Sequence, residues 1–292
     1  GRRSCPYQPV MASSSPSETT PNPSRAPAWL PPEAVFVVSA TSMYLGASLA
    51  VTLFSTLPPI AIAWLRVLFA GLLLLPVSRL PRANLGLVAA FGVALTCMNL
   101  SFYQSISLIP IGSAVAIEFL GPIVVAMVAA RTWKNATAVV CVSIGVVLVA
   151  GARPDGELAG VAWALAAAGC WAAYITLGHR LAKTGNGSQL IGPGMLIGVV
   201  VTAPLAATAA LPASSSWSLL GACLAVGLLS SAIPYSLEQW VFQRVTRDRF
   251  AILLGLLPAT AALLGLLVLS QHLSPTEWLG IALVGVAVAI KR

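Results

Sequence analysis

The sequence predicts an all-α membrane protein with ten transmembrane helices, arranged as two inverted five-helix repeats, with both the N- and the C-terminus in the cytoplasm. Its composition, its apolar runs and the placement of its basic residues predict this class. Of 292 residues, 58% are hydrophobic and only 8% are charged, whereas a soluble globular domain carries about 25% charged residues. A chain with so little charge cannot cover a water-facing surface, so we expect it to lie in a lipid bilayer.

The N-terminal tail, residues 1–28, is rich in Ser, Pro and Thr. Such a segment cannot bury enough apolar surface to offset its chain entropy, and we expect it to be disordered. Met11 is a candidate for the natural start. The first apolar run is too long for a cleavable signal peptide and lacks a cleavage pattern after it.

Ten apolar runs follow the tail, each near the ~20 residues that cross a bilayer as a helix. The links are mostly short and contain Pro, Gly or Ser, as helical hairpins require. The last run is short, but the Lys-Arg pair after it can reach the headgroups. The runs are Glu33–Phe54, Pro59–Val77, Asn84–Leu108, Ile111–Ala130, Asn135–Ala152, Leu158–His179, Gln189–Leu211, Ser216–Phe242, Phe250–Ser270 and Pro275–Ile290.

The basic residues set the orientation, because cytoplasmic loops carry an excess of Lys and Arg. With the N-terminus inside, only Arg153 falls in an outer loop, and Arg66 lies within the second run. This alternation also supports the count of ten runs, since a missed helix would scramble it. The inner segments carry Arg2, Arg3, Arg25, Arg79, Arg82, Arg131, Lys134, Arg180, Lys183, Arg244, Arg247, Arg249, Lys291 and Arg292.

Two halves are visible in the chain, a first repeat at 29–152 and a second at 153–292. Pro122 interrupts the fourth run and Pro258 the ninth, which is the fourth of the second half. Gly145 and Gly285 occupy similar places in the fifth and tenth runs. Because each half has an odd number of helices, the second half must enter the membrane inverted. Inverted repeats with interrupted helices at matching positions indicate a central site with alternating access.

Glu118 is the leading candidate for a functional side chain. A carboxylate in hydrocarbon costs several kcal/mol, so intramembrane acids usually face a cavity or a pathway. Pro122 lies four residues later and disturbs the Glu118 carbonyl. Burial favours the neutral acid and a nearby cation the carboxylate, so such an acid can exchange a proton or pair with a substrate ammonium. A structural acid bonded to a neighbouring helix is the alternative.

Two further charged residues lie within apolar runs. Glu238 shares a helix face with Tyr235, and either a functional role or a gate-anchoring ion pair fits it. Arg66 is the natural ion partner for either acid, because an unpaired guanidinium in lipid is costly. A structural role and the binding of a substrate carboxylate are both open for Arg66.

Polar and aromatic residues complete the candidate site. Asn99 and Tyr103 share a face of the third helix, where such residues either line a site or join helices. Trp171 and Tyr174 in the sixth helix either wall a cavity or pack against a neighbour.

Metal, nucleic-acid and cofactor functions find no support in the sequence. The five Cys and two His residues show no metal-ligand spacing, and we predict neither a metal nor a cofactor. The net charge of +8 comes from scattered basic residues rather than a basic face, so we expect no nucleic-acid partner.

Two motifs resemble those of a known family: Ile109–Pro122, which contains Glu-Phe-Leu-Gly-Pro, and Ser231–Glu238. Trp64–Arg66 and Gly169–Tyr174 are less specific. Over about residues 30–290 the chain resembles the EamA-type transporters of the drug/metabolite transporter superfamily, and within them the threonine/homoserine exporters. The resemblance implies a multi-pass protein of the bacterial inner membrane, the plasma membrane, that exports small amino acids or related metabolites in exchange for protons.

The chain departs from that resemblance at two places. The exporters usually carry an acid immediately before the ninth-helix proline, where this chain has Leu257. They tend to end the ninth helix in Gly-Glu, where this chain has Ser270-Gln271.

Three function classes follow. The first is a secondary transporter that exports threonine- or homoserine-like amino acids by proton antiport. The second is a facilitative uniporter, or an efflux system for another class of drug or metabolite. The third is a polytopic membrane enzyme, which the absence of paired acids, His clusters and long loops disfavours. We expect a small-molecule substrate, protons and the bilayer as partners, with a homodimer through the fifth and tenth helices as an open alternative.

Overall fold

A computed structural model describes residues 31–77, 85–129, 132–151, 157–182, 190–242, 244–245, 250 and 253–290 of the chain. Within these residues every regular element is a helix, which confirms the predicted all-α class. The predicted tail and most of the basic loop residues lie outside the described residues.

The helices follow the predicted apolar runs. The main ones are α1 (Pro32–Thr52), α2 (Pro59–Leu74), α3 (Leu85–Ile106), α4 (Ile111–Glu118), α5 (Leu120–Ala129), α6 (Trp133–Gly151), α7 (Leu158–Ala182), α8 (Ile191–Ala210), α9 (Trp217–Gly227), α10 (Ile233–Phe242), α12 (Leu257–Leu269) and α13 (Pro275–Ile290).

Among the described residues, six helical stretches are long and apolar enough to cross a membrane: Pro32–Ser55, Leu85–Ile106, Ile111–Ala129, Leu158–Leu181, Ile191–Ser215 and Trp217–Glu238. Four apolar helices are shorter: Pro59–Leu74, Ala136–Val149, Leu257–Leu269 and Pro275–Val288. Together these stretches coincide with the ten predicted runs.

The helix interruptions expected at two prolines are present. α4 ends at Glu118 and α5 begins at Leu120, because Pro122 has no N–H to donate to the Glu118 carbonyl. In the ninth run a turn at Gly255–Leu256 precedes α12, and Pro258 lies in the first turn of that helix, where a missing N–H is tolerated.

The eighth run was expected as one regular helix, but it contains a π-helical segment, η6 (Leu228–Ala232), between α9 and α10. Pro234 is the physical reason, because it cannot donate a hydrogen bond to the Ser230 carbonyl. That carbonyl accepts instead from the Arg66 side chain, with an N–O distance of 2.8 Å. The Leu229 carbonyl accepts from the Ser42 hydroxyl of α1 at 2.9 Å. Side chains of α1 and α2 thus satisfy the carbonyls that the irregular segment releases.

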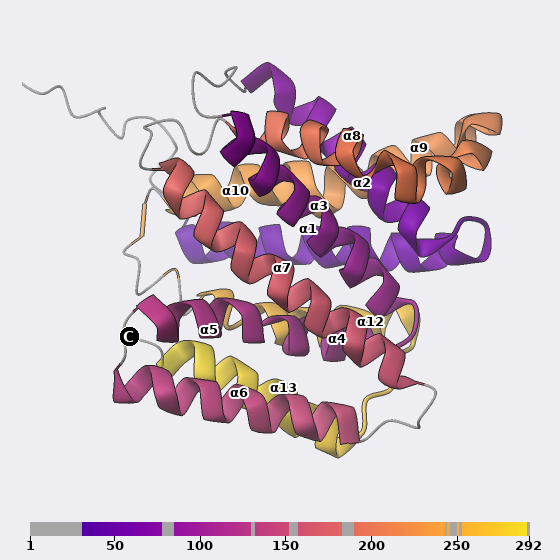
Figure 1. Cartoon of the computed structure of the whole chain (residues 1–292). Helices are drawn as coiled ribbons and strands as arrows, with labels where there is room; N and C mark the ends of the chain where they lie inside the picture. Colours follow the sequence, from indigo (N-terminus) through magenta and orange to yellow (C-terminus); the bar gives the residue numbers. More distant parts are fainter. Residues whose placement is uncertain are drawn as a thin grey trace, which may run out of the picture. The chain divides into compact units, whose positions relative to one another are not determined.

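Close helix packing determines the arrangement of the bundle. α3 lies against α7 and α8, α2 against α8, α1 against α10, and α4 against α12. α6 and α13 lie side by side along one edge (Figure 1). Where they cross, a Cβ atom on Gly145 would lie 2.8 Å from the Gly280 carbonyl oxygen, so only glycine permits this approach.

Candidate functional site

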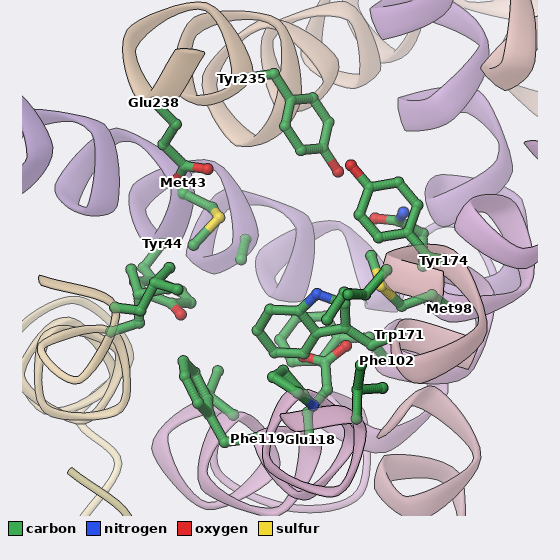
Figure 2. A pocket seen from close by; sticks show the side chains of 18 of the residues that line it. Met43, Tyr44, Met98, Phe102, Glu118, Phe119, Trp171, Tyr174, Tyr235 and Glu238 are labelled. Atoms are coloured by element: carbon green, nitrogen blue, oxygen red, sulfur yellow. The ribbon is translucent and has the colours of Figure 1, made fainter. Parts of the chain in front are cut away.

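A cavity of about 590 Å³ lies in the interior of the bundle, between helices from both halves of the chain. Its size is within the ~300–1,000 Å³ typical of small-molecule sites. Aromatic and aliphatic side chains form most of its wall (Figure 2). The lining residues are Met43, Tyr44, Ala47, Arg66, Met98, Asn99, Phe102, Val115, Glu118, Phe119, Pro122, Val125, Ala126, Ala129, Trp171, Tyr174, Ile175, Ile191, Tyr235, Glu238, Phe250, Leu254 and Leu257.

The cavity has an accessible end and a closed end. Along α5 its wall runs from buried Phe119 to exposed Ala129, so the mouth lies near the C-terminal end of α5. At the other end, every residue of α4 from Ile111 to Glu118 is buried. We call the region around the first turn of α4 the closed end.

Glu118 faces the cavity from the last residue of α4, and its side chain is 8% exposed. The helix break at Phe119 directly follows it. Phe119 packs edge-on against Trp171, with ring centroids 5.1 Å apart, and this pair walls the cavity beside the acid (Figure 2). The acid is therefore buried from lipid and reachable through the cavity.

Arg66 enters the cavity from α2, and neutral groups hold it rather than an acid. Its Nε donates to the Ser231 hydroxyl at 2.9 Å, and its Nη2 donates to the Ser230 carbonyl. Its Cζ lies 5.1 Å from the centroid of the Tyr103 ring, a cation–π contact. In the described part of the chain it forms no ion pair with Glu118 or Glu238. The direct ion pair that the sequence favoured is thus replaced by contacts with the π-helical segment.

Glu238 lines the cavity from α10. Its carboxylate accepts a hydrogen bond from the Ser39 hydroxyl of α1 at 3.4 Å. Tyr44 of α1 lines the same cavity as Glu118, Glu238 and Arg66. The two acids therefore reach one cavity from the two halves of the chain.

Two tyrosines and an amide form a polar patch on the cavity wall. The hydroxyls of Tyr235 and Tyr174 point toward one another from α10 and α7 (Figure 2). Asn99 interacts with Tyr235 and also donates to the Leu95 carbonyl of its own helix at 2.8 Å. This patch offers hydroxyl and amide groups between the apolar walls.

Eight of the ten residues that the sequence predicts for the site line this cavity: Arg66, Asn99, Glu118, Pro122, Trp171, Tyr174, Tyr235 and Glu238. Two do not. Tyr103 is fully buried beneath Arg66, and Pro258 is buried beside the lining residue Leu257. Both reach the site only through a neighbour.

Sequence reasoning missed the apolar part of the wall, including Met43, Met98, Phe102 and Leu254. Nothing distinguishes these side chains from the lipid-facing ones of an apolar helix. Among the described residues, no group of three or more His, Cys, Asp and Glu side chains is placed to hold a metal ion.

Comparisons with known proteins show which family the sequence resembles. A model of the EamA-like transporter family matches residues 158–291. The threonine/homoserine exporter RhtA of Escherichia coli (strain K12) is 34% identical over 265 residues, which cover 88% of this chain and 89% of that protein. RhtA of Salmonella typhimurium (strain LT2) matches with the same identity and coverage. The uncharacterized transporter YwfM of Bacillus subtilis (strain 168) is 30% identical over 131 residues, covering 44% of this chain and 43% of that protein.

The fold also has a counterpart among solved structures. One crystal structure aligns over 89% of this chain and 94% of its own with a TM-score of 0.58 and 17% sequence identity. At this identity the likeness concerns the fold alone.

Proposed function

This chain belongs to the EamA-like transporter family of the drug/metabolite transporter superfamily, and on that premise we propose that it exports small amino acids of the threonine/homoserine kind. It is a multi-pass protein of the bacterial inner membrane and a transporter rather than an enzyme. The proposal rests on its 34% identity with the RhtA exporters and on the charged groups of the cavity.

One observation carries the proposal: a guanidinium and two carboxyl groups face a single cavity without being ion-paired to each other. The two hydrogen bonds of Arg66 use two of its five N–H donors, and the rest can bind a substrate carboxylate as a planar fork. Glu238 or Glu118 can accept the substrate ammonium. A zwitterion therefore finds a partner for each of its charges.

With one acid binding the substrate ammonium, the other acid can carry the coupling proton. We assign the coupling proton to Glu118, because it lies beside the helix break and accepts, among the described residues, no hydrogen bond that would fix its ionised form. Glu238 takes the ammonium in this scheme, since its carboxylate lies within reach of the Ser39 hydroxyl, which is shared with the Pro234 carbonyl. Export by proton antiport then needs only that Glu118 is protonated from the outside and deprotonated to the inside.

Alternating access requires that the cavity can open at either end, and two inverted repeats at 29–152 and 153–292 would provide this. The packing supports such repeats. If each run of the first half is matched with the run five places later, the contact of α3 with α7 corresponds to that of α10 with α1. In the same way, the contact of α3 with α8 corresponds to that of α9 and η6 with α2. The pairs α6–α13, α2–α8 and α4–α12 map onto themselves. Ten spans with both termini in the cytoplasm fit this pattern and the basic loops.

A facilitative uniporter is the second candidate, and Leu257 favours it. This residue lines the cavity at the position where the exporters usually carry an acid. Without that carboxyl group, Glu238 is the one charged residue that the described part of the second half contributes to the cavity lining.

The substrate class is testable with inverted membrane vesicles. We expect unlabelled threonine and homoserine to compete with labelled threonine for uptake into the vesicles. Threonine methyl ester lacks the carboxylate and N-acetylthreonine lacks the ammonium, so neither should compete. Equal competition by these derivatives would contradict the proposed binding mode, and vesicles without the protein serve as the control.

A further inference from the structure

The closed end of the cavity contains a hydrogen-bonded connection between helices that the transport scheme above does not use. The first turn of α4 meets the segment that joins α12 to α13. Gln271 of that segment and Glu277 in the first turn of α13 bind α4 directly.

Gln271 is aimed at α4 by the end of α12. Ser270 has a left-handed backbone with φ of 53°, the one positive φ among the described non-glycine residues. This conformation ends the helix and lets the Gln271 N–H donate to the Gly265 carbonyl at 3.0 Å. The Gln271 Oε1 then accepts from the N–H of Ile111, the first residue of α4, at 3.1 Å. It satisfies a donor that a helix N-terminus would otherwise leave without a partner.

Glu277 makes two separable sets of contacts. Its Oε2 accepts from the Ser274 N–H and hydroxyl, each at 2.9 Å, while its own N–H donates to the Ser274 hydroxyl. This is a capping box at the start of α13. Its Oε1 accepts from the Ser113 hydroxyl of α4 at 2.9 Å. The side chain is 4% exposed. The first set stabilises α13 alone, and the second ties α13 to α4.

The position of these bonds suggests what they control. Ser113 precedes Glu118 on the same helix by five residues, and α4 lies so close to α12 that a Cβ on Gly112 would be 2.7 Å from the Cα of Ala262. A solute in the cavity can leave through the closed end if α4 separates from α12 and α13, which pack against it. Both hydrogen bonds cross the surface along which these helices would part.

We propose that the bonds Ser113–Glu277 and Ile111–Gln271 form a latch that holds the closed end shut, and that the latch opens and re-forms in each transport cycle. Gln271 and Glu277 are positioning residues in this account, because they act on α4 and not on the substrate. The inference rests on the proposed function, since only a transporter needs this end to open.

The latch is testable by pulsed electron spin resonance on the full chain. Spin labels at Leu108→Cys and His272→Cys, both exposed, report the separation of the segment before α4 from the α12–α13 segment in a chain whose five native cysteines are replaced. Ser113→Ala removes the hydroxyl that donates to Glu277 across the helices. We expect it to raise the ratio of the longer-distance to the shorter-distance population about tenfold, as the loss of one hydrogen bond to a charged group implies.

Ser274→Ala is the matched control, because it removes a serine hydroxyl bonded to the same carboxylate but leaves α4 attached. It should keep the parent distance distribution. Glu277→Gln should shift the distribution less than Ser113→Ala does, since an amide can accept from the Ser274 N–H and donate to Ser113 but carries no charge. Wild-type distances in Ser113→Ala, or the same change in Ser274→Ala, would overturn the latch.

A vesicle assay on the same variants separates the two proposals. Slower threonine transport in Ser113→Ala together with the longer distances supports the latch as part of the cycle. A parent chain that transports no amino acid would contradict the proposed function, and the distance measurement would still decide whether the latch exists.

Discussion

Arg66 shows how one residue stays charged within an apolar bundle and still remains available to a ligand. Burying a charge is expensive unless hydrogen bonds or an opposite charge compensate for it. Here a serine hydroxyl, a backbone carbonyl and the face of Tyr103 do so. Because no carboxylate is used up in this compensation, the acids of the cavity remain free to act on a substrate or a proton.

Arg66→Lys tests this arrangement. A lysine ammonium carries the charge but lacks the planar fork, so it cannot keep both serine contacts and bind a carboxylate with two bonds. We expect the apparent KM for threonine in vesicles to rise about tenfold with little change in maximal rate, as the loss of one charge-assisted bond implies.

Arg244→Lys is the matched control for that substitution. Arg244 is exposed, stacks on Trp240 with its Cζ 3.9 Å from the ring centroid, and is outside the cavity lining. Its substitution should leave KM unchanged. An unchanged KM in Arg66→Lys as well would contradict a role for Arg66 in binding.

At the residue scale the sequence identified the charged members of the cavity and missed the apolar ones. The sequence showed these charged residues, Glu118, Glu238 and Arg66, because a charge within a long apolar run is costly and usually has a function. Met98 and Phe102 carry no such signal, since lipid and a cavity wall favour the same side chains. Tyr103 was grouped with Asn99 because the two share a helix face, but only packing places its ring beneath Arg66.

At the scale of elements, prolines produce all three irregularities that shape the cavity. Pro122 and Pro258 interrupt two helices, and the sequence predicted both breaks from the missing N–H groups. Pro234 has the same deficiency, but its outcome was missed. Whether a helix breaks or widens into a π segment depends on which side chains donate hydrogen bonds to the freed carbonyls. That information resides in Ser42 and Arg66, which are distant in sequence.

The crossing of α6 and α13 supplies a prediction on stability. In Gly280→Ala the added Cβ would lie 2.7 Å from the Gly145 carbonyl oxygen, so the backbones must move apart. We expect a destabilisation of about 1–3 kcal/mol, measured as a lower midpoint of thermal unfolding in detergent.

Gly169→Ala is the control for this substitution, because nothing lies within 4 Å of the added Cβ. It should leave the midpoint unchanged or raise it, since alanine favours helix over glycine. Equal midpoints for the two variants would show that the crossing is less tight than the structure indicates.

At the scale of the whole molecule, the apolar runs predicted the helices because hydrophobic length is set by bilayer thickness. Their arrangement was harder to foresee. The sequence suggested two halves from Pro122, Pro258 and two glycines, whereas the packing supports the repeat through helix pairs that exchange with one another. The cavity mouth near Ala129 and the buried end at α4 were not predictable, because both lie in one apolar run and only packing against other helices distinguishes them.

The central claim is that Glu118 carries the coupling proton of an amino acid exporter. The most direct measurement is threonine accumulation by the purified protein in inverted proteoliposomes with an acidic lumen. We expect the wild type to accumulate threonine above equilibrium, and Glu238→Gln to do so with a raised KM. Glu118→Gln should fail to accumulate it, yet still exchange labelled for unlabelled threonine without a gradient. Gradient-driven accumulation by Glu118→Gln at the wild-type level would contradict the account.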